Sequence, residues 1–125
     1  MNNKIIVEVQ KTDFDLNSEM EALKLKTKKA GAVVFFVGKV RDLEDDKLQY
    51  LEIESFEELA TRKIKEICDD AATTWDLEYI LVKHRFGRLE LNDNIVLVIT
   101  SSKHRKNAYE AVSYTHLTLP TMWYV

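Results

Sequence analysis

The sequence is poor in several residue types, and each shortage excludes a class of protein. Its single cysteine, Cys68, cannot form an internal disulfide or, by itself, a metal site, so a reducing, cytoplasmic setting is expected. The three histidines and this cysteine show no metal-ligand spacing, and the three glycines make no glycine-rich phosphate loop. No apolar run approaches the roughly 18 residues of a membrane span, and the N-terminus lacks the pattern of a signal peptide.

The chain also lacks a strong excess of charge of either sign. Its 18 Lys and Arg and 21 Asp and Glu residues give a net charge of −3. The net charge therefore disfavours general nucleic-acid binding, including RNA binding, and any anion site must be a local cluster of basic residues. An apolar content of 46% with 31% charged residues is that of one ordinary globular domain.

The spacing of apolar residues predicts an α+β domain with a mixed or antiparallel sheet and helices over one side. The run at 31–42 is expected to be a buried central strand, and residues 43–47 a charged loop. Asn92 and Asp93 supply a turn. Strands are expected at 4–10, 31–42, 48–56, 77–87 and 94–101, and helices at 13–29, at 56–75 and, as a short helix, from about Ser102.

The last fourteen residues differ in composition from the rest of the chain. Residues 112–125 contain no Lys, Arg, Asp or Glu. After Ala111 the helical pattern loses its polar face, and Pro120 would end a helix. A buried C-terminal strand would fit this segment, but the segment also resembles translated sequencing-adapter sequence at the end of a truncated reading frame. We favour the second interpretation and divide the chain into a domain at 1–111 and an atypical tail at 112–125.

A cluster of basic side chains stands where the strand at 94–101 is expected to give way to a helix. In "SSKHRKNAYEA", Ser101 or Ser102 would cap the helix, and residues 103–106 (Lys, His, Arg, Lys) would form its first turn. Cations there oppose the helix dipole by about 0.3–1 kcal/mol unless an anion lies among them. Exposed N–H groups, the dipole and an Arg fork together make a phosphate site. A solvated helix start is the alternative.

A second basic segment, "GKVRD", directly follows an apolar run. Strand alternation places Lys39 and Arg41 on one side and Val40 on the other. Gly38 would let the backbone bend or a ligand approach closely. Two cations that end a strand at the surface are the alternative interpretation.

Two other residues with reactive side chains are expected to have structural roles. His84, which ends the strand at 77–87 beside Arg85, is expected to be a hydrogen-bonded structural residue. Cys68 lies on the apolar face of the long helix with nothing basic near it in the sequence. We therefore expect Cys68 to be an inert core thiol. The run "EELATRKIKE" is expected to be a solvated helix face.

Taken in order, four segments resemble one family, the large, catalytic subunit of molybdopterin synthase. They are "GAVVFFVGKVRD", "LEIESF" leading into a long helix, "VKHRFGRLELND" and "VITSSKHRKNAYEA", within a resemblance that runs from about Ile5 to Ala111. The resemblance implies an α/β hammerhead-type fold and a subunit that dimerises as the core of a heterotetramer. It implies a small ubiquitin-like sulfur-carrier subunit whose Gly-Gly C-terminus enters the pocket as a thiocarboxylate.

The reaction implied by the resemblance transfers two sulfurs to cyclic pyranopterin monophosphate and forms the dithiolene of molybdopterin, with no cofactor. Family pocket positions map onto Arg41, His104 and Arg105, the expected catalytic residues, and Phe36 matches a pocket wall. Arg105 and Arg41 would clamp the cyclic phosphate, and His104, with a reference pKa of ~6.5, would move a proton. We predict that Arg41, His104 and Arg105 converge on one concave surface. The substrate-binding set is Arg41, Arg105, Lys103, Phe36 and Lys39.

The sequence departs from the family in two places. A His-Tyr-Pro-Gly-Met-like segment is replaced by "SFEEL" at 55–59, and no lysine follows Lys106, where the family has two active-site lysines. If the tail is native, the chain would be an inactive relative. The alternative from another class is a non-catalytic binding module that docks a phosphorylated metabolite or a partner's tail, and the missing lysines are its best support.

Overall fold

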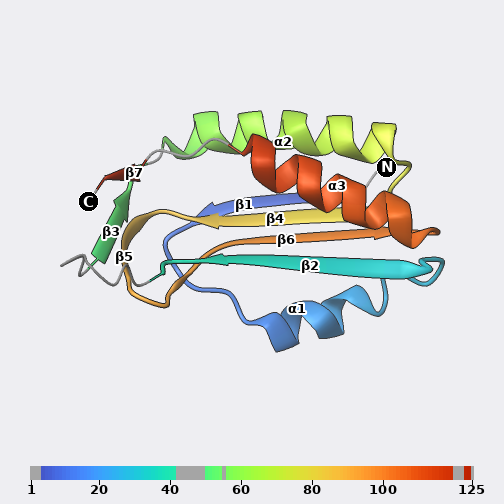
Figure 1. The fold of residues 1–125 in the computed structure, drawn as a ribbon, viewed down its shortest axis with the longest axis horizontal. Coiled ribbons are helices and arrows are strands. Elements are labelled where there is room, and N and C mark those ends of the chain that lie inside the picture. Colours follow the sequence, from blue (N-terminus) through green and yellow to red (C-terminus); the bar gives the residue numbers. More distant parts are fainter. Residues whose placement is uncertain (1–3, 42–49, 55, 120–122, 125) are drawn as a thin grey trace.

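The computed structural model describes residues 4–41, 50–54, 56–119 and 123–124, and Figure 1 shows how their strands and helices are arranged. The expected loop at 43–47, Ser55 and Pro120 lie outside these residues. The elements are β1 (Ile5–Gln10), α1 (Leu16–Leu23), β2 (Ala32–Lys39), β3 (Tyr50–Ile53), α2 (Glu57–Thr74), β4 (Tyr79–Arg85), β5 (Gly87–Glu90), β6 (Asn94–Ser102), α3 (Arg105–Thr118) and β7 (Trp123–Tyr124).

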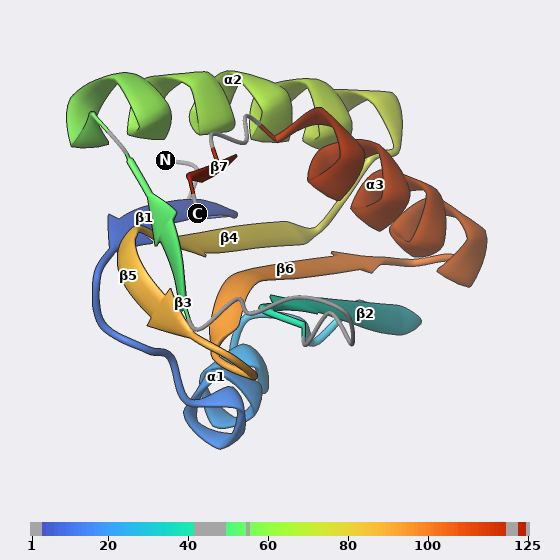
Figure 2. The ribbon, with the colours of Figure 1, turned by 60° about the vertical axis from the view of Figure 1, so that its left-hand side comes forward.

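Strand pairing divides the fold into two sheets. The larger is mixed and has the order β1-β4-β6-β2, with β1 parallel to β4 and the other pairs antiparallel. The smaller is antiparallel, with the order β5-β3-β7, and β3 and β5 cross one end of the larger sheet (Figure 2). The expected α+β fold with a mixed sheet and packed helices is confirmed.

The position of β2 corrects the sequence-based expectation. β2 is the edge strand of the larger sheet and not a central strand, and Val33 is 40% exposed. Its continuous apolar pattern has another cause, because its side chains pack on both faces of the sheet. Phe36 joins one core cluster and Phe35 the other. An apolar run shows that both faces of a strand are covered, but not whether both of its edges are paired.

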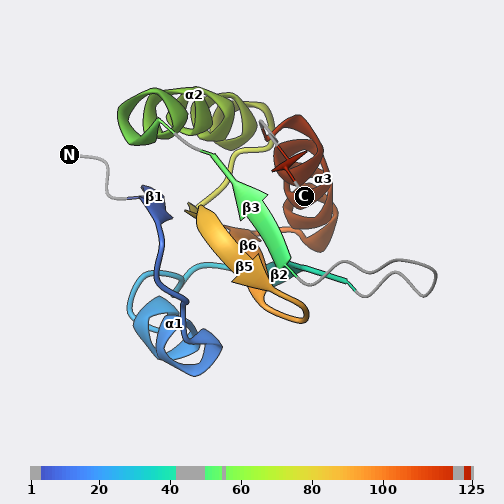
Figure 3. The same ribbon diagram turned by 90° about the vertical axis from the view of Figure 1, so that its left-hand side faces the viewer.

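Helices cover both faces of the larger sheet, so the expectation of helices on one side is wrong for α1. Figure 3 shows α2 and α3 on one side of the sheet and α1 on the other. Alternate residues of β4 serve the two cores: Ile80 packs in the cluster with Ile64 of α2, and Leu81 in the cluster with Phe14 and Leu23 beside α1. The strand β4 is therefore buried on both faces.

Two elements are longer or more regular than expected. Part of the connection after β4 forms the strand β5, and the turn that follows it contains Asn92 with a φ of 71°, in the left-handed region. The helix α3 is not short. It continues past Ala111 to Thr118, and Val112 and Thr115 are buried on its inner face. Within the described residues, none of the helices is both long enough and apolar enough to cross a membrane.

A charge cluster ties α1 to the sheet. Asp15 caps α1 by accepting a hydrogen bond from the Asn17 N–H at 3.1 Å, but Leu16 and Met20 are exposed and contribute little burial. The ammonium of Lys83 in β4 contacts the carboxylates of Glu19 in α1 and Glu8 in β1.

Burial lowers the pKa of Lys83, but the hydrogen bonds and charges of Glu19 and Glu8 outweigh burial, so its pKa is raised overall. A raised lysine pKa means that the folded state holds the proton more tightly than the unfolded state. The stabilisation is complete below the ordinary lysine pKa and is lost as the pH rises through the raised value.

We expect Lys83→Met to lower the free energy of unfolding by about 2 kcal/mol, because it leaves the poorly exposed Glu19 carboxylate without its partner. Lys24→Met is the matched control. It removes an exposed pair with Glu21 and should cost no more than about 0.5 kcal/mol. Urea unfolding at pH 7 measures both values. Equal losses in the two variants would contradict the anchoring role of Lys83.

Candidate functional site

The basic residues 103–106, here called the cationic turn, lead from β6 into α3. All four side chains are exposed, and no acidic residue lies in the first turn of α3. The helix begins with His104 as its N-cap, in an extended conformation and without a side-chain cap. The cationic turn therefore presents two lysines, one arginine, His104 and the N-terminus of a 14-residue helix to solvent.

The expected capping role of Ser101 or Ser102 is wrong. Both serines are buried and belong to β6, where Ser101 pairs with Tyr79 and Ser102 with Ala32. The hydroxyl of Ser102 accepts a 3.4 Å hydrogen bond from the His104 N–H. Pairing with β2 extends the strand through both serines, and pairing with β4 reaches Ser101, so the helix begins later than their capping preference indicates.

The second basic group follows the far end of β2. Val40 is buried and exchanges backbone hydrogen bonds with the turn after β5: its N–H donates to the Asp93 carbonyl at 2.9 Å, and its carbonyl accepts from the Asn92 N–H at 2.7 Å. Lys39 and Arg41 are exposed on either side of it. The predicted alternation of two exposed cations around a buried valine is confirmed.

The structure does not bring the two basic groups together within one chain. Because β2 and β6 are antiparallel, Arg41 lies beyond the end of β2 and beside the start of β6, whereas His104 and Arg105 lie beyond the end of β6 and beside the start of β2 (Figure 1). At roughly 3.3 Å per residue, the length of β2 alone separates them by about 23 Å. The prediction that they converge on one surface of a single chain is wrong.

Phe36 and Gly38 lie on the face of β2 that α3 covers. The Phe36 ring stacks on the His116 imidazole, with centroids 4.1 Å apart and an angle of 24° between the planes. A Cβ at Gly38 would lie 2.9 Å from a methyl carbon of Val96 and 3.6 Å from the Phe36 ring. Gly38 therefore makes room for core packing. The contact with His116 has no signal in the sequence, because it depends on how α3 crosses the sheet.

His84 and Arg85 have structural roles, as expected for His84. His84 is 8% exposed, and its Nδ1 lies 2.9 Å from the Arg85 carbonyl oxygen, which accepts the hydrogen bond. Burial lowers the pKa of His84 more than this hydrogen bond raises it. The Arg85 guanidinium donates to the carbonyls of Lys11 and Asn94. These bonds join the loop after β1 to the start of β6.

Cys68 is inert in this environment, as predicted. It is 0% exposed on the inner face of α2. Burial, helped by the negative charge of Asp69, raises the pKa of its thiol to about 12. A thiol that stays protonated and inaccessible is neither a nucleophile nor a ready metal ligand. Among the described residues, the His, Cys, Asp and Glu side chains form no group of three that could hold a metal ion.

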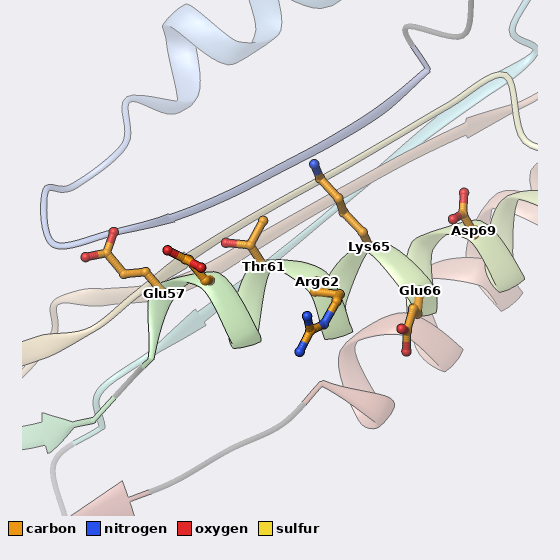
Figure 4. A pocket seen from close by; sticks show the side chains of 7 residues that line it. Glu57, Thr61, Arg62, Lys65, Glu66 and Asp69 are labelled. Carbon is orange, nitrogen blue, oxygen red and sulfur yellow. The ribbon is translucent and has the colours of Figure 1, made fainter.

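An open hollow of about 680 Å³ lies along the outer face of α2 (Figure 4). It mixes acidic and basic side chains of one helix, and it includes none of the predicted site residues. This agrees with the expected solvated helix face. The lining residues are Glu57, Glu58, Thr61, Arg62, Lys65, Glu66 and Asp69.

Comparisons with known proteins point to one family. A family model described as "MoaE: MoaE protein" matches residues 9–116. A molybdopterin synthase catalytic subunit from Vibrio cholerae is 43% identical over 109 residues, which are 86% of this chain and 72% of that protein. The chain covers 62% of a second relative of this name, from Ralstonia nicotianae, at 38% identity over 86% of this chain.

Solved structures share the fold. The molybdopterin cofactor biosynthesis protein E from Burkholderia multivorans superposes with a TM-score of 0.83 at 32% identity, over 98% of this chain and 88% of that one. A complex of subunits 1 and 2 of the molybdopterin-converting factor from Helicobacter pylori contains a chain with a TM-score of 0.71 at 23% identity, over 86% of this chain and 72% of that one.

The environment of Cys68 predicts very slow thiol chemistry. We expect the native protein to react with a thiol-specific disulfide reagent at pH 8 at less than about one-hundredth of the rate of the protein unfolded in urea. The chain has no other thiol, so the absorbance of the released reagent reports Cys68 alone. Fast labelling of the native protein would contradict the buried position.

Proposed function

The chain belongs to the MoaE protein family, and from this membership we propose that it is a catalytic subunit of molybdopterin synthase. Its reaction would transfer two sulfurs, one from each of two thiocarboxylated carrier molecules, to cyclic pyranopterin monophosphate, in the cytoplasm, and so form the dithiolene of molybdopterin. The observation that carries the proposal is the exposed cationic turn at the N-terminus of α3, within the matched residues. An anionic substrate would remove the unfavourable interaction between these cations and the helix dipole.

Each residue of the cationic turn has a distinct task in this proposal. The Arg105 guanidinium offers a planar fork for two phosphate oxygens, and the N–H groups of the first turn add further donors. Lys103 supplies a flexible point charge. His104 would pass a proton as the carrier's thiocarboxylate sulfur attacks the pterin and the ring opens.

Arg41 requires a second copy of the chain to reach this substrate. We propose a homodimer whose two-fold axis passes near the middle of β2, since such an axis brings the Arg41 end of one chain to the cationic turn of the other. In the described part of the chain, no strand pairs with the outer edge of β2, and Val33 on that strand is 40% exposed. Lys39 would contribute beside Arg41.

The partner in this proposal is a small ubiquitin-like sulfur-carrier subunit with a Gly-Gly C-terminus, one on each chain of the dimer. The Helicobacter pylori complex of two converting-factor subunits shares the fold and agrees with a heteromeric assembly. The alternative of a non-catalytic binding module is disfavoured, because the named relatives are catalytic subunits.

A shared site predicts complementation between inactive variants. Arg41→Ala and His104→Ala should each lose most single-turnover activity with thiocarboxylated carrier. Co-expressed, they should recover about one quarter of the wild-type activity, because half of the dimers are mixed and each mixed dimer has one intact site of two. Molybdopterin formation measures the recovery.

The matched control pairs His104→Ala with Arg105→Ala. Both changes fall in the same cationic turn, so every site of the mixed dimer still lacks one residue, and no recovery is expected. Equal recovery in the two mixtures would contradict the shared site, and full activity of Arg41→Ala alone would remove Arg41 from it.

The uncharged tail predicts low activity for this chain. Lysines in the family's corresponding segment would act as flexible charges near the thiocarboxylate, and His116, a single imidazole, cannot replace two of them. Replacing residues 112–125 with a lysine-bearing helix that keeps Val112, Thr115 and Leu119 should raise the single-turnover rate on the order of 10²-fold. These three residues are kept because they are buried.

The control for the tail is the same helix with Gln in place of each Lys, which should not accelerate transfer. Comparable rates for the original and lysine-bearing chains would show that the tail is competent as it stands.

A further inference from the structure

We propose that Gly31 is a positioning residue for the cationic turn: its missing side chain lets the segment before β2 lie directly against the backbone of Lys103. This inference rests on the proposed function, since it concerns the placement of His104 and Arg105 for the substrate phosphate. Gly31 touches neither the substrate nor the reacting atoms, and it acts through the backbone of the turn.

The contact is between two main chains. The Gly31 N–H donates to the Ser102 carbonyl at 2.9 Å, which extends the pairing of β2 and β6 by one residue. A Cβ at Gly31 would overlap the carbonyl oxygen of Lys103 and lie 3.1 Å from its carbonyl carbon. Any residue other than glycine at this position therefore requires a shift of the backbone of Lys103 or of the segment before β2.

Space, and not backbone conformation, makes glycine necessary here. Gly87 has a φ of 92°, which favours glycine for conformational reasons, but Gly31 is not among the residues with a positive φ. An alanine at position 31 therefore carries no penalty for a positive φ. Gly31→Ala is therefore a steric probe of one contact.

The displacement would fall on the cationic turn, because α3 is fixed just after it. Ala108 is fully buried, and its carbonyl accepts a 2.8 Å hydrogen bond from the Thr100 hydroxyl. The Asn107 amide donates to the Trp75 carbonyl at 3.0 Å. With β6 paired on one side and α3 anchored on the other, a shift of the Lys103 carbonyl has to be absorbed between positions 103 and 106.

The fold itself should tolerate the substitution. Gly31 is exposed and belongs to neither core cluster, so an added methyl group disturbs no core packing. The effect should therefore appear in the geometry of the turn and in substrate binding, and the cost in stability is that of moving the backbone and not of disturbing the core.

The test compares Gly31→Ala with the wild-type chain and with Ala30→Gly, a change in the same loop that adds flexibility without bulk. In Gly31→Ala we expect kcat/KM for cyclic pyranopterin monophosphate to fall about 10–100-fold, mostly through KM, because displaced groups hold the phosphate poorly. Affinity for the carrier should not change. Amide chemical shifts should move at 103–106 and stay constant at 109–118. Gly31→Ser adds the same Cβ and serves as a second variant.

The outcomes separate this inference from the proposed function. Wild-type amide shifts at 103–106 in Gly31→Ala would overturn the positioning role, whatever the activity. An equal rise of KM in Ala30→Gly would also overturn it, because flexibility of the loop would then explain the effect. Displaced shifts in a protein whose wild-type form makes no molybdopterin would contradict the proposed function and leave the positioning contact supported.

Discussion

The antiparallel pairing of β2 with β6 is the constraint on which the rest of the structure depends. It runs from Ala32 opposite Ser102 to Lys39 opposite Asn94. The pairing fixes β6 in place up to the residue before the cationic turn, and it sends Arg41 to the other end of the sheet. Backbone hydrogen bonds hold a residue next to each basic group: the Ser102 carbonyl accepts from the Gly31 N–H, and Val40 pairs with the turn after β5. Strand register therefore sets where the two basic groups lie, and their side chains remain exposed.

Much of the fold could be predicted from the sequence, because the apolar period is a local property. The long helix with Ile64 and Cys68 inside was predicted correctly, as was the α+β class with a mixed sheet. Three features were not predicted: the edge position of β2, the strand β5, and the placement of α1 on the face of the sheet opposite to α2 and α3. Each of these depends on pairings between residues far apart in the chain, for which periodicity carries no information. The α1 helix is an example, since Lys83 meets Glu19 across 64 positions.

The candidate site divides in the same way. Local patterns correctly predicted whether a residue is an exposed cation or a buried structural residue. The environments of four residues agree with the prediction: Lys39, Arg41, His84 and Cys68. Where these groups lie relative to one another did not follow. Strand alternation gives the side of a sheet that a residue occupies, but it does not give the end of the sheet at which a strand stops. The prediction that Ser101 or Ser102 caps α3 was wrong for a related reason. The hydrogen bonds that pair β6 with its neighbours outweigh the preference of serine for a helix N-cap.

Among the residues that the structure describes, no strand pairs with the outer edge of β2, and this edge and the separated basic groups are two aspects of one arrangement. An exposed edge strand with apolar side chains is an aggregation hazard, and proteins cover such edges or shield them with charge. The strand β2 has a charged side chain at its end, Lys39, but Val33 is exposed near its start. A second copy that packs there with two-fold symmetry would cover the edge and, by the same operation, bring the Arg41 end of each chain to the cationic turn of the other. A single symmetric contact would thus cover the edge of β2 and also complete the proposed site. A contact elsewhere on the surface would leave the edge of β2 exposed and Arg41 far from the cationic turn.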